Sequence, residues 1–139
     1  MSLTKSVAPC PLPELRVLVL DDDQFQLDAL GESLLSLGLK DVTLSMSGDE
    51  ALRMVTTGGV PFDLMLCDLQ MPGMDGFKFM ENVSKNGFAG SLIIVSGQRS
   101  DVVHSASLVA QLRRFTLLGT LRKPVQRGAL AQLLVKPAS

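Results

Sequence analysis

The sequence is poor in the residues that build several common kinds of site. Its 139 residues include only two cysteines, Cys10 and Cys67, and one histidine, His104. No other cysteine or histidine stands at metal-ligand spacing around either cysteine, which argues against a disulfide framework or a zinc site. The same scarcity fits a reducing compartment, so we expect a cytoplasmic protein. His104 lies away from the predicted strand ends, and we assign it no catalytic role.

The chain also lacks a strong net charge and a long apolar run. Lys and Arg number 13 against 14 for Asp and Glu, a formal net charge of −1. Without an overall basic field, direct nucleic-acid binding is not expected. No apolar run approaches the roughly 18 residues of a membrane span, and the N-terminus lacks a signal-peptide pattern. With 46% apolar and 19% charged residues, the composition is typical of a core-rich globular domain.

The domain organisation predicted from composition is simple. A chain of this size fits one domain that buries roughly 68% of its unfolded surface. Residues 1–13 end in a proline-rich stretch that sustains neither a helix nor a central strand, so we expect a flexible leader there. We expect the folded domain over residues 14–136, with residues 137–139 as a tail or the start of a linker.

Short apolar runs alternate along the chain with segments of helical periodicity. The runs cover residues 17–20, 64–67, 92–95 and 117–118, with a weaker alternating run at 42–46. Runs that are apolar on both faces are typical of buried parallel strands. Between them, Asp23 with Gln26 and Ser47 with Glu50 resemble capping boxes that open helices. Three more helices are predicted at about 75–85, around 102–112 and around 130–134. Five strand–helix units predict an α/β fold with a doubly wound parallel sheet and helices on both faces.

Polar side chains stand directly after four of the predicted strands. They are Asp21, Asp22 and Asp23 after the first strand, Asp68 after the third, Ser96 after the fourth and Lys123 after the fifth. In doubly wound sheets, ligands bind beyond the carboxyl ends of the strands, where the strand order reverses. If the strand order is 2-1-3-4-5, these side chains converge on one pocket.

Such a cluster of carboxylates needs a counter-charge. Two carboxylates roughly 4 Å apart repel by about 4 kcal/mol at an effective dielectric constant near 20. Mg²⁺ accepts oxygen ligands, takes one or two carboxylates and completes its shell with phosphate oxygens. Asp68 is then a candidate nucleophile that forms an acyl phosphate, with Ser96 and Lys123 as candidate partners for the phosphoryl oxygens.

Some of these residues also have simpler structural explanations. We expect Asp23 to be a helix N-cap, whereas Asp21 and Asp22 cannot both fill that role. Cys67 precedes Asp68 and should point to the opposite face of its strand, so we expect it to pack in the core.

Four motifs, in this order, resemble the receiver domains of two-component response regulators, of which the chemotaxis regulators are an example. The matching segments are the acidic pair in residues 19–23, the phosphoacceptor loop in residues 68–76, the Ser/Thr switch strand in residues 94–97 and the signature Lys123-Pro124. The resemblance covers about residues 14–135. It implies a flavodoxin-like five-stranded sheet in the order 2-1-3-4-5.

The resemblance also implies a phosphoryl-accepting, magnesium-dependent site. Asp68 would take the phosphoryl group from a histidine kinase, with Mg²⁺ held by Asp22, Asp68 and the backbone carbonyl of Gln70. Asp21 would act mainly through a water on the metal. The domain would not be an enzyme beyond catalysing its own phosphotransfer and dephosphorylation.

The remaining family positions concern phosphoryl binding and the switch. Ser96 and Lys123 would hold the phosphoryl oxygens, and the Lys123-Pro124 peptide bond would be cis. Receivers usually carry an aromatic residue three positions before the lysine, where this chain has Thr120. An aromatic switch is therefore not expected, and a signal must travel by backbone or helix movement.

The resemblance further implies partners. They are a sensor histidine kinase or phosphotransfer protein, and an output domain or partner protein that binds through the fourth helix, fifth strand and fifth helix. A homodimer stays open. Residues 96–134 look most like receivers joined to cyclic-di-GMP phosphodiesterase output domains. Six basic residues against one acidic residue between Arg99 and Arg127 form either a solvated face or a docking surface.

Two other functions remain to be weighed. A phosphatase of the haloacid-dehalogenase type also starts with a strand and an Asp-x-Asp motif, here Asp21 and Asp23, but it needs acidic metal ligands after the lysine and room for a cap. Nothing after Lys123 is acidic. The other is a docking module of receiver fold that is never phosphorylated, against which the complete set of Asp21, Asp22, Asp68 and Lys123 argues.

Overall fold

The computed structural model describes residues 14–57, 61–68, 71, 76–88, 90–97 and 116–135, without the side chains of residues 76, 77 and 135. Several predicted features lie outside these residues and stay predictions. They are the leader, the fourth helix, the tail, Gln70, His104 and the basic residues Arg99, Arg113 and Arg114.

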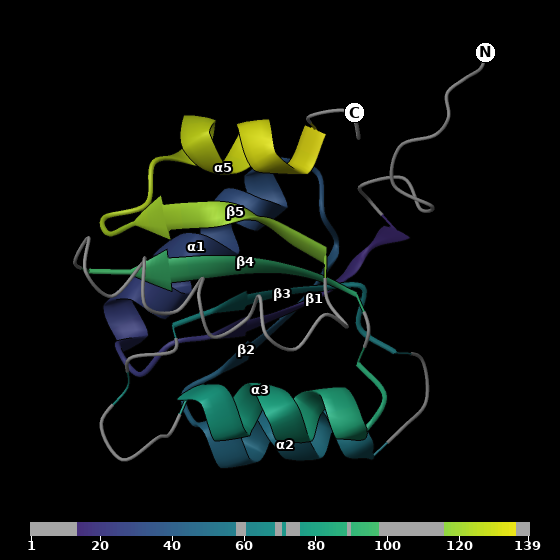
Figure 1. Cartoon of the computed structure of the whole chain (residues 1–139). Coiled ribbons are helices and arrows are strands. Elements are labelled where there is room, and N and C mark those ends of the chain that lie inside the picture. The colour runs from purple at the N-terminus through teal and green to yellow at the C-terminus, as the bar shows by residue number, and fades with distance from the viewer. Residues whose placement is uncertain are drawn as a thin grey trace.

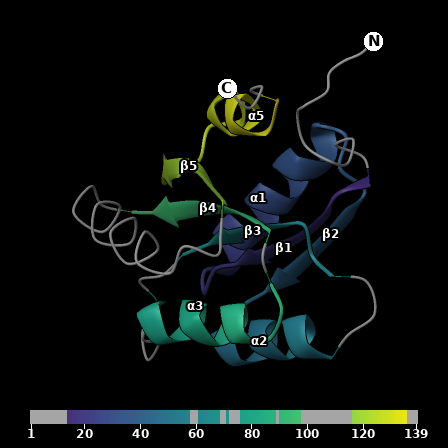
Figure 2. The same ribbon diagram turned by 45° about the vertical axis from the view of Figure 1, so that its right-hand side comes forward.

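Five parallel strands form one sheet in the order β2-β1-β3-β4-β5, as predicted. The strands are β1 (Arg16–Leu20), β2 (Asp41–Ser45), β3 (Leu64–Cys67), β4 (Ser91–Ser96) and β5 (Thr116–Arg122). The described helices are α1 (Gln24–Ser36), α2 (Gly48–Thr56), α3 (Gly76–Lys85) and α5 (Arg127–Val135). Helices α1 and α5 cover one face of the sheet and α2 and α3 the other (Figures 1 and 2). None of the helices within the described ranges is both long and apolar enough to cross a membrane.

Alternate residues of the central strands supply two separate cores. Val17 and Val19 pack into the cluster with α1 and α5, whereas Leu18 and Leu20 pack into the cluster with α2 and α3. The same alternation continues in β3 and β4, which explains why these runs are apolar at every position. Cys67 is free and buried in the α2/α3 cluster, as expected. Because helices cover both faces, the carboxyl ends of the strands are where polar groups can gather.

The two predicted capping boxes form only in part. The carboxylate of Asp23 accepts a hydrogen bond from the amide of Phe25 at 2.9 Å, which confirms Asp23 as the N-cap of α1. The amide of Asp23, however, donates to Asp21 Oδ1 at 2.9 Å rather than to Gln26. The reciprocal half of that box was therefore wrong, because a carboxylate of the acidic pair takes the donor.

The second capping pair, Ser47 and Glu50, also forms only one of the two hydrogen bonds of a capping box. Ser47 Oγ accepts from the amide of Glu50 at 3.0 Å, as an N-cap of α2 should. The Glu50 carboxylate does not return to the amide of Ser47. It accepts a hydrogen bond from Ser45 Oγ at 2.9 Å instead.

The fifth strand is longer than its short apolar run predicted. Its pairing with β4 shifts register, so that Leu92 lies opposite Leu117 while Ile93 lies opposite Gly119. The extra residue is Leu118, and Gly119 and Thr120 after it end the apolar pattern that marks the other strands. Gly119 also allows α5 to pack closely, since a Cβ there would lie 2.6 Å from the side chain of Leu133.

Gly90→Ala should destabilise the domain, because the added Cβ would lie 2.5 Å from the backbone oxygen of Asp63, which cannot move aside as a flexible side chain can. That oxygen also accepts the amide of Ser91 at 3.0 Å where β4 begins. We expect a loss of about 1–3 kcal/mol in the free energy of unfolding, measured with urea.

Gly128→Ala is the matched control, because its Cβ would meet no atom within 4 Å and Ala is the better helix former. We expect this variant to be as stable as the wild type or more so. Equal destabilisation by both substitutions would contradict the packing described at Gly90.

Candidate functional site

Backbone hydrogen bonds just past the strand ends fix the predicted site residues at one edge of the sheet. They run from Asp21 N–H to Ser45 O at 3.1 Å, from Asp68 N–H to Leu20 O at 3.1 Å and from Lys123 N–H to Ser96 O at 2.8 Å. Each bond extends a parallel ladder by one step beyond the strand. The side chains that follow therefore start from a rigid edge rather than from a free loop.

One ammonium group joins two of the predicted carboxylates. Lys123 Nζ lies 2.7 Å from Asp68 Oδ2 and 2.8 Å from Asp21 Oδ2. The contact with Asp68 spans 55 positions of sequence. The Asp21 side chain is fully buried, and those of Asp68 and Lys123 are 8% and 17% exposed. The structure thus brings together residues from β1, β3 and β5, as the sequence predicted.

Burial and charge act in opposite directions on these groups. Burial raises the pKa of Asp21, although its contacts with Lys123 partly oppose this. Burial alone would lower the pKa of Lys123, but the carboxylates of Asp21 and Asp68 outweigh it and raise that pKa. The stabilisation that Lys123 gives the fold is therefore fully present at pH values below the usual lysine pKa of 10.5. It is lost as pH rises through the higher pKa that Lys123 has in the folded state.

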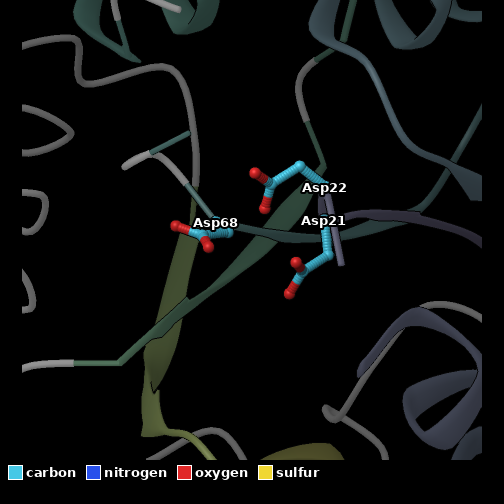
Figure 3. Close-up of side chains that lie close together, drawn as sticks. All are labelled: Asp21, Asp22 and Asp68. Atoms are coloured by element: carbon cyan, nitrogen blue, oxygen red, sulfur yellow. The ribbon is translucent and has the colours of Figure 1, made fainter. Parts of the chain in front are cut away.

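The third carboxylate, that of Asp22, is exposed at the rim of the site. Asp21, Asp22 and Asp68 each offer an oxygen within 4.8 Å of the others. Figure 3 shows Asp21 and Asp22 leaving the end of β1 in different directions, with Asp68 across from them. Among the residues that the structure describes, Asp21 Oδ2 is buried and has no partner other than Lys123, with which it forms an ion pair. Clustered carboxylate oxygens, one of them open to solvent, fit a hard divalent cation such as Mg²⁺.

Ser96 and Thr120 lie where the sequence predicted. Ser96 ends β4 and is buried, and its carbonyl accepts the amide of Lys123. The Lys123-Pro124 peptide bond is cis, as expected. Thr120 lies on β5 opposite Ile94 and is exposed. The carbonyl of Gln70, expected to be a metal ligand, lies outside the described residues.

The comparison with known proteins agrees with this arrangement. Residues 17–135 match the family model of the response regulator receiver domain. The chain belongs to this family. The receiver is 30% identical over 124 residues to the cyclic di-GMP phosphodiesterase RocR of Pseudomonas aeruginosa, covering 88% of the chain and 31% of that protein. It is also 30% identical over 116 residues to the Regulator of RpoS of Escherichia coli, covering 84% of the chain and 32% of that protein.

Solved structures support the same family. A response regulator from Colwellia psychrerythraea superposes with a TM-score of 0.69 at 27% identity, covering 86% of this chain and 93% of that one. The receiver spans about a third of the length of the two curated relatives named above. The similarity therefore covers only part of each of those proteins.

The position of Asp23 also bears on the phosphatase alternative. An Asp-x-Asp mechanism needs Asp21 and Asp23 at the reacting centre. The Asp23 carboxylate is exposed and caps α1 instead. Together with the family match, this decides in favour of a receiver.

The contact of Ser45 with Glu50, next to the backbone of Asp21, was not predicted from the sequence, which assigned Glu50 to a capping box. The alternation of β2 gave no signal for it, because the apolar positions of residues 42–46 are Val42, Leu44 and Met46, and Ser45 stands at a polar position between them.

Lys123→Met should cost more stability at about pH 8 than at about pH 5. Without the ammonium, the already raised pKa of Asp21 rises further. When the pKa of a carboxyl is higher in the folded than in the unfolded chain, the free energy of unfolding falls as pH rises above the unfolded pKa, which is 3.8 for Asp. Urea unfolding at both pH values should show an additional loss of about 1–3 kcal/mol at the higher one.

The matched control is Lys85→Met, which removes an exposed cation from the last turn of α3. Its effect on the free energy of unfolding should be small and nearly the same at both pH values. A loss in Lys123→Met that does not change with pH would be incompatible with the ion pairs described here.

Proposed function

We propose that this receiver accepts a phosphoryl group on Asp68 from a phosphohistidine of a sensor histidine kinase or a phosphotransfer protein. In this step, a bond forms between a carboxylate oxygen of Asp68 and phosphorus, and the bond between phosphorus and the histidine nitrogen breaks. The observation that carries the proposal is the contact of Lys123 with Asp68 inside the acidic cluster. It supplies a fixed positive charge where three phosphoryl oxygens would arrive.

Two strand ends supply groups for those oxygens. Phosphorylation adds about −1.5 to −2 charges to a carboxylate that already has acidic neighbours. The ammonium of Lys123 donates a hydrogen bond to Asp68. The backbone N–H of Lys123 donates another to the carbonyl of Ser96, which places Ser96 beside Lys123. We assign both side chains to binding the phosphoryl oxygens.

Mg²⁺ is the cofactor that these residues fit. Asp22, Asp68 and the carbonyl of Gln70 would hold the ion, and Asp21 would act mainly through a bound water. When bound, the ion supplies positive charge that lowers the repulsion between carboxylates and incoming phosphate. The exposed Asp22 leaves the site open to entry from solvent.

The signal then passes to an output domain or a partner protein. We propose that it leaves through β5, α5 and the predicted fourth helix, and that backbone movement carries it, because Thr120 is not aromatic. A cyclic-di-GMP phosphodiesterase output fits the similarity to RocR. The receiver itself would act as a signalling domain in the cytoplasm, formed by residues 14–136 between a leader and a linker, with homodimerisation open.

The first test is labelling with acetyl phosphate in the presence of Mg²⁺. Intact-mass spectrometry should show one phosphoryl group on the wild type and none on Asp68→Asn, because the amide is not a nucleophile. Asp49→Asn, which removes an exposed carboxylate from the first turn of α2, is the control and should be labelled like the wild type. Labelling of Asp68→Asn to the wild-type extent would refute the assignment of the acceptor.

The second test concerns the metal. Mg²⁺ at about tenfold above its dissociation constant should stabilise the wild type by about 1.4 kcal/mol. Asp22→Asn should lose most of this gain but be at least as stable as the wild type without metal, since it removes one of three repelling charges.

Glu32→Gln provides the comparison, because it removes one exposed negative charge from α1. Thermal unfolding with and without Mg²⁺ should show the full gain in this variant. If Asp22→Asn keeps the full gain, Asp22 is not a ligand.

A further inference from the structure

The side chain of Ser45 closes the turn between β2 and α2. Ser45 is the last residue of β2 and is 1% exposed. Its Oγ lies 2.9 Å from Glu50 Oε1 and 3.0 Å from the carbonyl oxygen of Ser47, and either oxygen can accept the hydroxyl proton. The amide of Ser47 lies 3.4 Å from the same oxygen. The hydroxyl therefore fixes the backbone that leaves β2 and ties it to the first turn of α2.

The backbone of Ser45 also contacts the first residue of the acidic pair. The carbonyl of Ser45 accepts the amide of Asp21 at 3.1 Å. Asp21 is the first residue after β1, and Asp22 follows it at the rim of the site. The Ser45 carbonyl thus holds the backbone of Asp21 at the point where the acidic pair follows β1.

Stability alone does not require this arrangement. An alanine at position 45 would be buried without needing any partner, whereas a buried hydroxyl must be paired to offset its desolvation. The N-cap of α2 is supplied by Ser47, not by Ser45. What the contact between Ser45 and Glu50 adds is a fixed turn directly beside Asp21.

We propose that Ser45 and Glu50 are positioning residues for the metal-binding acidic pair. They act through the Ser45 carbonyl on the amide of Asp21 and touch neither metal nor phosphate themselves. The inference rests on the proposed function, since it assigns Asp21 and Asp22 to a site for Mg²⁺. Residues that orient metal ligands affect metal affinity although they make no contact with the ion.

Ser45→Ala and Glu50→Ala test the proposal. Isothermal titration with Mg²⁺ alone should give a dissociation constant about three- to tenfold higher in each variant. The double variant should bind no more weakly than the weaker single variant, because both changes break one contact. Amide hydrogen exchange at Asp21, followed by NMR without metal, should be faster in all three.

Two control variants separate positioning from other effects. Glu50→Gln keeps an oxygen acceptor for Ser45 Oγ but removes the charge, so its dissociation constant should stay within about twofold of the wild type. Ser47→Ala removes the N-cap of α2 and should lower the unfolding temperature without changing Mg²⁺ affinity.

The proposal is overturned if Ser45→Ala lowers the unfolding temperature but leaves Mg²⁺ affinity unchanged, or if Ser47→Ala weakens binding as much as Ser45→Ala does. Labelling by acetyl phosphate keeps the two proposals apart. A labelled wild type with unchanged Mg²⁺ affinity in Ser45→Ala refutes positioning alone. An unlabelled wild type with the predicted differences in affinity refutes the phosphoacceptor role and supports positioning at the metal site.

Discussion

The ion pairs of Lys123 with Asp21 and Asp68 are the interaction on which the site depends. Three carboxylates with oxygens within 4.8 Å of one another would repel strongly in a partly buried setting. The ammonium of Lys123, in contact with two of them, offsets part of this repulsion. In the function proposed above, the same charge would meet an incoming phosphoryl group, so one contact would serve both the resting and the phosphorylated domain.

The sheet explains why these groups lie together. Both of its faces are covered by apolar side chains and helices, which leaves the strand ends for polar chemistry. Parallel strands in the order β2-β1-β3-β4-β5 bring the end of β1 beside that of β3, with β4 and β5 next in line. Phosphorylation at Asp68 would therefore change the charge balance at the ends of several strands at once. A ligand shifts a two-state equilibrium only by its differential stabilisation of the two states, about 5.5 kcal/mol for a shift from 1:99 to 99:1.

Much of this was predictable from the sequence, for physical reasons. The continuous apolar runs marked β1, β3 and β4, because strands buried on both faces cannot alternate with polar residues. The positions directly after those runs then pointed to Asp21, Asp22, Asp68 and Ser96, and Lys123 followed the fifth strand. The length of β5 was not predictable, since Gly119 and Thr120 interrupt its apolar pattern after Leu118. The capping pairs misled in one respect, because side chains two residues earlier, Asp21 and Ser45, accept the amides of Asp23 and Ser47 in place of the predicted reciprocal partners.

The most direct test of the account is a crystal structure of the receiver with Mg²⁺ and beryllofluoride, which mimics a phosphoryl group on a carboxylate. We predict beryllium bound to a carboxylate oxygen of Asp68, with Lys123 Nζ in hydrogen-bonding contact with a fluorine. An adduct on another residue, or an adduct on Asp68 that Lys123 does not contact, would contradict the account.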